Sequence, residues 1–477
     1  MQFDTDVAVI GGGTAGLVSA SVAASLGARA TMIEADKVGG ECLWRGCVPS
    51  KTLLKSARVF HTVKGAAEFG VHVEKSRLIW SAVKLRLADV RDEIKANERK
   101  ALQKSGVETL SGRARFLDNH TLEIKSKSGT TQLTAKKFVL ATGSTPRIPD
   151  IEGLEEAGYI PPDGLFDKPS LPKSLIFIGG GPVSIEMAQA FARFGASVTV
   201  LQHGERILDK EEPEVSALML KLLRAEGITI YLQAKAKRAE MDGERKKIWF
   251  DTPDGEQSVV AGEIVVSIGK VPVYQHLGLE NIGVKASEKG IEVDSHLKTS
   301  ASNVWACGDA TGGPYFTHTA ENQGKIAGAN AVLPAPLAQK LDSRGLSWVT
   351  FTDPEVAHLG QTLAQATKEW GESARAWQIP FSELDRAIIE GETAGFARII
   401  TTGSGRIVGA HIVGAHAGEL IGSLIIPVRE GALIGEFGEA MFPYPTLGEI
   451  VHKAGNQYYQ ELLESDLAQK ALKFLPK

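Results

Sequence analysis

The sequence predicts an α/β protein with two Rossmann-like nucleotide-binding folds and a C-terminal α+β domain. Two glycine-rich turns, each between a short apolar strand and a helix, predict the two folds. After residue 345 the chain changes to short strands and helices without a further glycine-rich turn, which predicts the third domain. At 477 residues the chain is about three times the commonest domain length of ~100–150 residues, so it has room for several domains.

Composition and charge exclude several classes of protein. Hydrophobic residues make up 43% and charged residues 23%, as in globular proteins, and the net charge of −4 gives no overall positive field for nucleic acid. No apolar run approaches the ~18 residues of a membrane span, and a strand begins too early to leave room for a signal peptide. Three cysteines are too few for a secreted disulfide framework. We therefore expect a cytoplasmic protein that binds neither nucleic acid nor membranes.

The first glycine-rich turn has the full context of a dinucleotide-binding fold. The segment Gly11-Gly12-Gly13-Thr14-Ala15-Gly16 follows a predicted strand over 7–10 and precedes a predicted helix over 17–26. A second predicted strand, 30–33, ends at Glu34. The glycines allow close backbone approach to a pyrophosphate, the helix N-terminus faces that anion, and the carboxylate binds ribose hydroxyls. The pattern predicts a dinucleotide site; a merely structural turn is the alternative.

A second copy of the pattern begins at Gly179. The segment Gly179-Gly180-Gly181-Pro182-Val183-Ser184 lies between a predicted strand, 175–178, and a predicted helix, 185–194. The next strand, 197–201, ends at Gln202, which follows Gly179 by the same 23 residues that separate Gly11 from Glu34. Ser184 stands at the third glycine position, where a small residue still permits close packing. We therefore expect a second dinucleotide site.

The end of this strand bears on the choice of nucleotide. Gln202 replaces the acid that would bind an NAD ribose and repel a 2′-phosphate. His203 follows directly, and Arg206 adds a cation three residues further on. These residues favour NADP(H). NADH is the alternative if His203 and Arg206 are ordinary loop residues in solvent.

Three further strands end in turns that could face a ligand. Ligands of open α/β sheets bind at the carboxyl ends of the strands. The residues at these ends are Ala141-Thr142-Gly143, Gly269 and Asp309. Asp309 could reach the ligand of the first fold if the chain returns to that fold after the second one. We accordingly place domains at 1–150 and 270–345 for the first fold, 151–269 for the second, and 346–477 for the C-terminal domain.

The two close cysteines form the most specific motif. Cys42 and Cys47 lie five residues apart, and Pro49 suits the first position of a helix expected to run to residue 63. Cys47 would then lie just before the helix N-terminus, whose dipole favours the reactive thiolate. A zinc site would need ligands that the neighbouring sequence does not supply, and a buried structural pair is the other alternative. The motif favours redox chemistry.

Together these motifs resemble the class I flavoprotein disulfide reductases over essentially the whole chain. The resemblance implies FAD on the first fold, NAD(P)H on the second, a redox-active Cys42–Cys47 disulfide, and a C-terminal dimerisation domain that forms a homodimer. It rests on both glycine-rich turns and on four further segments: the Gly-Gly-x-Cys-x-x-x-x-Gly-Cys-x-Pro-Ser-Lys run from Gly39 to Lys51, Ala141-Thr142-Gly143, Gly308-Asp309, and Thr352-Asp353-Pro354-Glu355.

The resemblance also implies roles for individual residues. Cys47 would be the charge-transfer thiol near the flavin, and Cys42 the interchange thiol facing the acceptor. Lys51 would approach the flavin and pair with Glu186, with an ordinary surface ion pair as the alternative. His318 would lie near the flavin or, as an equally open interpretation, in the core. The FAD site would comprise Gly11, Gly13, Thr14, Ala15, Gly16, Glu34, Gly40, Lys51, Ala141, Thr142, Gly143, Asp309 and His318, and the NAD(P) site Gly179, Gly181, Gln202, His203 and Gly269.

The C-terminal region departs from the disulfide-reducing members. They carry His-Pro-Thr and a following Glu, whereas this chain has Tyr444-Pro445-Thr446 and then Glu449. An unperturbed tyrosine, with a pKa near ~10 against ~6.5 for histidine, is a poor proton acceptor at neutral pH. Phe442-Pro443-Tyr444 is similar to the mercuric reductase branch, although the tail 472–477 lacks that branch's cysteine pair. His452 is a candidate substitute base or, alternatively, a solvated helix histidine.

We predict an FAD-dependent NAD(P)H oxidoreductase that passes electrons through the Cys42–Cys47 disulfide to a small acceptor. The acceptor would be a metal ion, as for mercuric reductases, or a small disulfide, with Tyr444 and Glu449 on the acceptor side. The alternative is a dihydrolipoamide dehydrogenase with Tyr444 in place of the usual histidine base. A catalytically silent nucleotide-binding dimer is a third interpretation, against which the intact cysteine pair argues.

Overall fold

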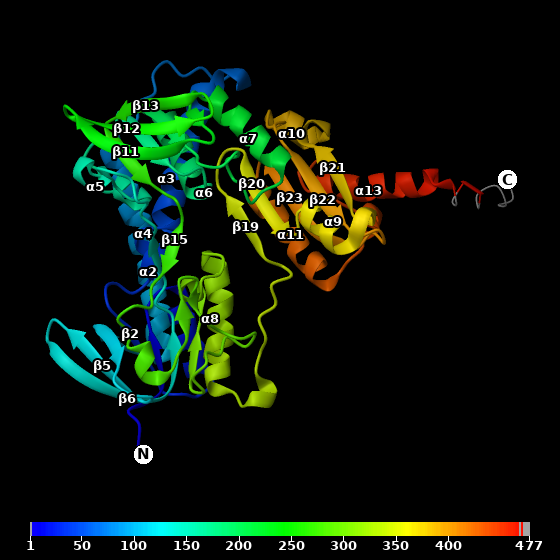
Figure 1. Ribbon diagram of the computed structural model, residues 1–477. Helices are drawn as coiled ribbons and strands as arrows, with labels where there is room; N and C mark the ends of the chain where they lie inside the picture. The colour runs from blue at the N-terminus through cyan, green and yellow to red at the C-terminus, as the bar shows by residue number, and fades with distance from the viewer. Residues whose placement is uncertain (1, 467–468, 471–477) are drawn as a thin grey trace. The chain divides into compact units, whose positions relative to one another are not determined.

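A computed structural model describes residues 2–466 and 469–470, which fall into two compact units (Figure 1). The first unit contains the chain up to Ile151 together with Gly158–Pro172 and Val265–Leu341. The second contains Glu152–Ala157, Lys173–Ile264 and the chain from Asp342 onward. The second glycine-rich fold and the C-terminal domain thus share one unit, and the four domain boundaries expected from the sequence stay a prediction.

The first unit is built on a seven-stranded sheet with the order β3-β2-β1-β6-β5-β4, in which β18 also pairs with β6. The strands around β1 are parallel, whereas β4, β5 and β6 pair in antiparallel fashion. The central strand β1 is apolar and buried, as expected for a strand covered on both faces. The bounds are β1 (Thr5–Ile10), β2 (Ala30–Glu34), β3 (Glu108–Ser111), β4 (Arg113–Phe116), β5 (Thr121–Ser126), β6 (Gly129–Leu140) and β18 (Val304–Ala306).

Two helices of this unit, α1 and α8, pack closely because α8 carries glycines where they meet. A Cβ added at Gly324 would lie 2.6 Å from the Ala15 carbonyl oxygen, and one at Gly328 would lie 2.5 Å from that of Ser19. The packing holds the first turn of α1 beside the segment that contains Asp309. The helices are α1 (Thr14–Ser25), α2 (Gly40–Trp44), α3 (Cys47–Gly65), α4 (Trp80–Ser105) and α8 (Thr317–Val332).

Short elements complete the first unit. Strand β15 pairs antiparallel with β7, and this pairing places Lys270 of β15 next to the segment that follows β6. The short strands are β7 (Ser144–Pro146), β15 (Lys270–Pro272), β16 (Ala286–Ser287) and β17 (Gly290–Ile291), and the 3-10 helices are η1 (Ala66–Phe69), η2 (Pro162–Leu165), η3 (Leu279–Ile282), η4 (Gly308–Thr311) and η5 (Ala335–Leu337).

The second unit contains the second glycine-rich fold. Its four-stranded sheet has the order β10-β9-β8-β14, and β8, β9 and β10 are parallel. A separate antiparallel sheet of β11, β12 and β13 is drawn in green in Figure 1. The elements are α5 (Leu154–Ala157), β8 (Ser174–Ile178), α6 (Pro182–Arg193), β9 (Ser197–Leu201), α7 (Pro213–Ala225), β10 (Thr229–Tyr231), β11 (Lys235–Asp242), β12 (Arg245–Thr252), β13 (Gly255–Ala261) and β14 (Glu263–Val266).

The C-terminal part of this unit is a five-stranded antiparallel sheet with the order β19-β20-β23-β22-β21. Helix α11 packs against β20 and β23, and its buried side chains join the core of the sheet. The elements are β19 (Ser347–Thr350), β20 (Glu355–Gly360), α9 (Leu363–Trp370), η6 (Gly371–Ser373), β21 (Arg375–Pro380), η7 (Phe381–Glu383), α10 (Asp385–Glu390), β22 (Phe396–Thr401), β23 (Ile407–Gly414), α11 (Ala417–Glu430), α12 (Ile434–Glu439) and α13 (Glu449–Glu464).

The predicted α/β fold is confirmed, but some helix starts are corrected. Helix α6 begins at Pro182 rather than residue 185, because proline suits the first helical position. Helix α13 begins at Glu449. The bonds at its start, from Glu449 N to Thr446 O at 3.4 Å and from Ile450 N to Leu447 O at 3.2 Å, span three residues as in a 3-10 turn. Among the described residues no helix is both long and apolar enough to span a membrane.

Candidate active site

A cavity of about 390 Å³ lies in the first unit, where the turns after β1 and β6 meet. It brings together most of the residues predicted for the first nucleotide site: Gly11, Gly13, Thr14, Ala15, Glu34, Gly40, Ala141, Thr142, Gly143 and Asp309. Cys42 and Cys47 line the same cavity. The predicted dinucleotide residues and the predicted redox pair thus form one site.

The turn after β1 requires glycine on steric grounds. Gly11 has φ +109°, and an added Cβ would lie 2.2 Å from the Ala141 carbonyl oxygen. Gly16 does not line the cavity; a Cβ there would lie 1.8 Å from the Gly11 carbonyl oxygen. Gly13 precedes α1, whose first turn has no side-chain cap and no acidic residue. The free N–H groups of α1 therefore suit an anion such as a pyrophosphate.

Glu34 is fixed by two backbone hydrogen bonds. Its Oε2 accepts the Gly12 N–H at 2.5 Å, and its Oε1 accepts the Asp36 N–H at 2.7 Å. The half-buried carboxylate at the end of β2 lines the cavity. This position suits contact with the hydroxyls of a ribose.

The two cysteines lie on consecutive helices. Cys42 is on α2, and Cys47 is the first residue of α3, not the residue before it as predicted. The prediction placed Pro49 first, but the first helical hydrogen bond runs from Ser50 N to Gly46 O at 3.1 Å. Pro49 therefore sits in the first turn without costing a hydrogen bond. With no acid in that turn, the N-terminus of α3 favours thiolate at Cys47.

The two thiols have different environments. Both side chains are thiols in the structure, not joined by a disulfide. Cys47 is exposed, and its Sγ lies 3.4 Å from Thr317 Oγ1. Cys42 is half-buried, and its hydrogen bond to Cys47, its burial and the nearby Cys47 charge all raise its pKa. The raised pKa favours the protonated form of Cys42.

Two polar pairs that the sequence did not indicate also line the cavity. Lys270 Nζ lies 2.6 Å from Glu41 Oε2, and Ser144 Oγ donates to Asp309 Oδ2 at 2.6 Å. Burial raises the pKa of Asp309. The sequence did not indicate Lys270, because no motif contains it. It reaches the cavity only through the pairing of β15 with β7.

Besides Gly16, three further predicted residues, Lys51, Glu186 and His318, are placed outside the lining of this cavity. Lys51 lies on α3 in the first unit, and Glu186 lies on α6 in the second, where its Oε1 accepts the Phe351 N–H at 2.8 Å. The expected ion pair between them stays a prediction. His318 is exposed with its ring stacked on Phe316, whereas its neighbour Thr317 lines the cavity.

The second glycine-rich turn repeats the geometry of the first. Gly179 has φ +110°, and Gly181 precedes α6. Gln202 Oε1 accepts the Gly180 N–H at 2.8 Å, which is the contact that Glu34 makes with Gly12. The equal spacing of the two motifs thus has a structural basis, with a neutral amide replacing a carboxylate. Predicted Gly269, with φ +106°, belongs to the first unit.

The residues after Gln202 include a cation with spare donors. Arg206 donates one bond, from Nη2 to the Asp209 carbonyl oxygen at 3.4 Å. Its Nη1 is buried and has no hydrogen-bond partner among the described residues. Gln202 Nε2 donates to the Arg206 carbonyl oxygen at 2.9 Å, which ties the two residues together, while His203 is exposed. A 2′-phosphate would satisfy the guanidinium.

The three candidate acid-base residues of the C-terminal region, Tyr444, Glu449 and His452, have different environments. Tyr444 is 69% exposed, and its hydroxyl donates to Asp385 Oδ2 at 2.8 Å, so the carboxylate raises its pKa. Glu449 begins α13. His452 is half-buried: its Nδ1 lies 2.9 Å from the Phe437 carbonyl oxygen and its Nε2 3.0 Å from Asn456 Nδ2. Both ring nitrogens are occupied, which argues against His452 as the substitute base.

Comparison with known proteins supplies the family. The pyridine nucleotide-disulphide oxidoreductase pattern matches residues 5–324, and its dimerisation-domain pattern matches residues 346–455. A mercuric reductase of Bacillus cereus is 33% identical over 94% of this chain and 70% of that protein. A dihydrolipoyl dehydrogenase of Bacillus subtilis is 32% identical over 94% of this chain and 96% of that protein.

A solved structure shows the same fold. The Cu(II) complex of the HOCl-induced flavoprotein disulfide reductase RclA from Escherichia coli has a TM-score of 0.84 at 24% identity, covering 96% of this chain and 100% of that one. The cavity itself fits FAD, since the uncapped N-terminus of α1 suits a pyrophosphate and Glu34 is set for a ribose. The chain belongs to the pyridine nucleotide-disulphide oxidoreductases, enzymes that bind FAD and use NAD(P)H.

Proposed function

We propose that the protein moves electrons from NADPH, by way of FAD and the Cys42–Cys47 pair, to a small acceptor such as a soft metal ion or a small disulfide. One observation carries this proposal: both cysteines line the cavity that also contains Gly11 and Glu34. FAD, when bound, supplies a group that accepts a hydride from the nicotinamide and passes two electrons on.

The chain's own residues would hold the two nucleotides. The turn at Gly11 and Gly13 with the N-terminus of α1 would bind the FAD pyrophosphate, Glu34 its ribose, and Asp309 its ribityl chain. The turn at Gly179 and Gly181 would bind the NADPH pyrophosphate, with Gln202, His203 and Arg206 around the 2′-phosphate. Lys51, paired with Glu186, would stabilise negative charge on the reduced flavin.

The cysteines would handle electrons and protons in a fixed order. One NADPH would convert the disulfide into one thiol, one thiolate and NADP⁺, because the transferred hydride carries two electrons and a single proton. The raised pKa of Cys42 keeps its proton on sulfur, and the N-terminus of α3 stabilises thiolate at Cys47. Cys42, as the interchange thiol, would meet the acceptor. Reduction of one mercuric ion to the metal consumes one NADPH and releases one proton.

The metal ion is favoured over a disulfide by the residue at position 444. A disulfide acceptor needs a base and acid to manage thiol protons, whereas a soft metal ion binds thiolates directly. Tyr444 is exposed and holds its proton against Asp385, so it is a poor base. Two mercuric reductases are 33% and 32% identical in sequence to this chain.

Dihydrolipoamide dehydrogenase activity is the second candidate. Dihydrolipoyl dehydrogenases are nearly as similar to this chain as the mercuric reductases. Glu449 is retained, but Tyr444 replaces the histidine base, which would make reduction of NAD⁺ by dihydrolipoamide slow. The dimerisation-domain match over 346–455 supports a homodimer, and the cysteine content supports a cytoplasmic location.

An acceptor panel tests the proposal. The holoenzyme is mixed anaerobically with NADPH and then with mercuric ion, cupric ion, lipoamide, glutathione disulfide or a quinone. We expect NADPH to bleach the flavin and a metal ion to give the fastest turnover. Fastest turnover with lipoamide would support the dehydrogenase instead. Failure of NADPH and NADH to bleach the flavin would indicate a silent nucleotide-binding dimer.

Replacing Gln202 by glutamate should shift nucleotide choice from NADPH toward NADH. The introduced carboxylate would still accept the Gly180 N–H, so the turn keeps its hydrogen bond while the new negative charge repels the 2′-phosphate. In Gln202→Glu we expect kcat/KM for NADPH to fall on the order of 10- to 100-fold, the worth of one charged hydrogen bond. Arg206→Ala should lower kcat/KM for NADPH but not for NADH. Equal losses with both nucleotides would contradict the NADPH assignment.

Replacing Tyr444 by histidine should raise activity with lipoamide or other small disulfides. A histidine supplies a proton acceptor near neutral pH, so the rate of thiol-disulfide exchange should rise on the order of 10²-fold. Reduction of the flavin by NADPH should stay at the wild-type rate, since the change does not touch the nucleotide sites. Tyr444→Phe is the matched control that removes only the hydroxyl. An unchanged rate with lipoamide in Tyr444→His would show that position 444 does not serve proton transfer.

A further inference from the structure

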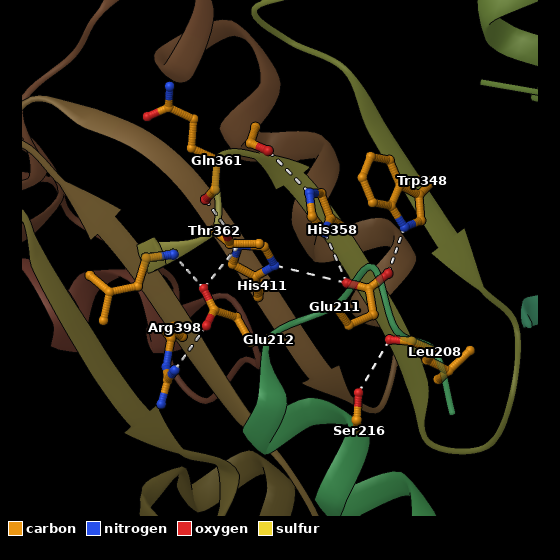
Figure 2. A network of polar contacts seen from close by, with 12 residues as sticks. Leu208, Glu211, Glu212, Ser216, Trp348, His358, Gln361, Thr362, Arg398 and His411 are labelled. Carbon is orange, nitrogen blue, oxygen red and sulfur yellow. Dashed lines mark hydrogen bonds and ion pairs between the residues drawn. The ribbon is translucent and has the colours of Figure 1, made fainter. Parts of the chain in front are cut away.

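A second cluster of chemically active side chains lies within the second unit (Figure 2). Glu211 precedes α7, His358 lies on β20, and His411 lies on β23 directly opposite His358 in the antiparallel pair. Their side chains are 2%, 3% and 0% exposed. The three residues are far apart in the sequence, so no motif indicated them.

Hydrogen bonds fix which nitrogen of each histidine faces the carboxylate. His358 Nε2 lies 3.0 Å from the Gly360 carbonyl oxygen, and His411 Nε2 lies 3.0 Å from that of Gln361. A carbonyl only accepts hydrogen bonds, so each Nε2 carries the proton and a neutral ring then has its lone pair on Nδ1. Both Nδ1 atoms face Glu211. Backbone carbonyls commonly orient metal-binding histidines in this way.

Glu211 presents a single oxygen to the two rings. Its Oε1 accepts a hydrogen bond from Trp348 Nε1 at 2.6 Å. Its Oε2 lies 2.9 Å from His358 Nδ1 and 3.9 Å from His411 Nδ1, and all three atoms are within 4.8 Å of one another. With both rings neutral, three electron pairs therefore converge on one buried point. Within the part of the chain that the structure describes, His411 Nδ1 has no hydrogen-bond partner.

We propose that Glu211, His358 and His411 bind one divalent transition-metal ion, with Zn²⁺ the best fit. A tetrahedral Zn²⁺ with bonds of about 2.0–2.1 Å holds its ligand atoms about 3.3 Å apart. That separation falls between the 2.9 Å and 3.9 Å that join Glu211 Oε2 to the two Nδ1 atoms, and the two Nδ1 atoms lie within 4.8 Å of each other. The side chains would draw together around the ion. Two imidazoles and one carboxylate are a common zinc set, and a water molecule would complete the tetrahedron.

A proton on His358 is the competing explanation, and it accounts for less. An imidazolium at His358 would donate both to Glu211 and to Gly360, but His411 Nδ1 would stay buried without a partner among the described residues. The nearby Glu212 is held by Arg398 at 3.3 Å, so it does not compete for the ion.

Such an ion would tie the segment before α7 to strands β20 and β23. Its ligands come from both the second glycine-rich fold and the five-stranded sheet, which lie in one unit. A single ion would therefore link the second glycine-rich fold to the five-stranded sheet, in addition to the side-chain packing between them. We expect its main effect on stability, with Tm higher when the ion is bound.

Zinc content of the oxidised holoenzyme tests the proposal. With Cys42 and Cys47 joined as a disulfide, their thiols do not bind the metal. The FAD-loaded protein is treated with EDTA, dialysed, incubated with Zn²⁺, freed of excess ion and measured by mass spectrometry of the metal. We expect about one Zn²⁺ per chain from the single three-ligand site, and a Tm that rises on zinc addition.

His411→Gln is the decisive variant, because a glutamine amide can still donate toward Gln361 while the Nδ1 ligand is lost. We expect bound zinc to fall at least tenfold in His411→Gln and to stay near one per chain in the control Glu212→Gln. Should His411→Gln fail to fold, as judged by FAD content and circular dichroism, Co²⁺ added to the wild-type protein gives a second readout. Visible bands of tetrahedral Co²⁺ without sulfur-to-cobalt charge transfer would support the site. Wild-type protein without zinc, or zinc unchanged in His411→Gln, would overturn it.

Discussion

Cys42→Ser and Cys47→Ser should each lose NADPH-dependent turnover of the acceptor by on the order of 10³-fold or more, as for removal of other covalently acting residues. The two thiols line the cavity together, and neither serine can form the disulfide that carries the electron pair. Turnover is measured by oxidation of NADPH with mercuric ion and with lipoamide. Anaerobic bleaching of the flavin by NADPH should persist in both variants, because it precedes the disulfide.

The two variants should differ in their spectra. The N-terminus of α3 favours thiolate at Cys47, and the raised pKa of Cys42 favours its protonated form. The resemblance to the family implies a long-wavelength charge-transfer band from that thiolate. The band should vanish in Cys47→Ser and remain in Cys42→Ser. Cys307→Ser is the matched control: the Cys307 thiol is buried, its pKa is raised by burial to about 12, and its loss should leave turnover unchanged. A Cys42→Ser variant with full turnover would contradict the assigned thiol pair.

Gly11→Ala should abolish FAD binding and destabilise the first unit. The added Cβ would lie 2.2 Å from the Ala141 carbonyl oxygen at a backbone φ of +109°, so the turn after β1 has to move. We expect a loss of about 3 kcal/mol or more in the free energy of unfolding. If the same free energy is lost from FAD binding, the affinity for FAD falls by at least about 100-fold. Thermal unfolding and the FAD content of purified protein measure the two effects.

Gly27→Ala separates the steric clash from the backbone strain. Gly27 also has a positive φ, +86°, but its Cβ would meet nothing within 4 Å. We expect a cost of about 1 kcal/mol from strain alone and full FAD content. If Gly11→Ala behaved like Gly27→Ala, the close approach of the turn to Ala141 would not govern the nucleotide site.

Residues in local motifs were predictable from the sequence. The turn at Gly11, the carboxylate of Glu34 and the amide of Gln202 act through contacts set by strand–turn–helix spacing, and the structure shows the same backbone contact in both copies. The cysteines were predictable because Cys42, Cys47 and the proline after them lie within one short segment. Such spacing is preserved by local geometry alone.

Residues brought together by distant pairings were not predictable. Lys270 reaches the cavity through β15 and β7, and the Glu211, His358 and His411 cluster forms only when β20 and β23 are paired. The long helix α4 is a different case, since Trp80, Val83, Leu87, Val90 and Ile94 recur at helical spacings of three and four residues. The sequence therefore contained the signal for this helix, although none of the recognised motifs includes it. The positions of Lys270 and of the Glu211, His358 and His411 cluster depend on how distant strands pair, which composition does not reveal.

The most direct test of the account is the number of electrons that the oxidised holoenzyme accepts. Anaerobic titration with dithionite should take four electrons per FAD in the wild-type protein, two for the flavin and two for the Cys42–Cys47 disulfide. Cys42→Ser should take two. A wild-type protein that takes only two electrons per FAD would contradict the claim that the two cysteines form the redox centre of this enzyme.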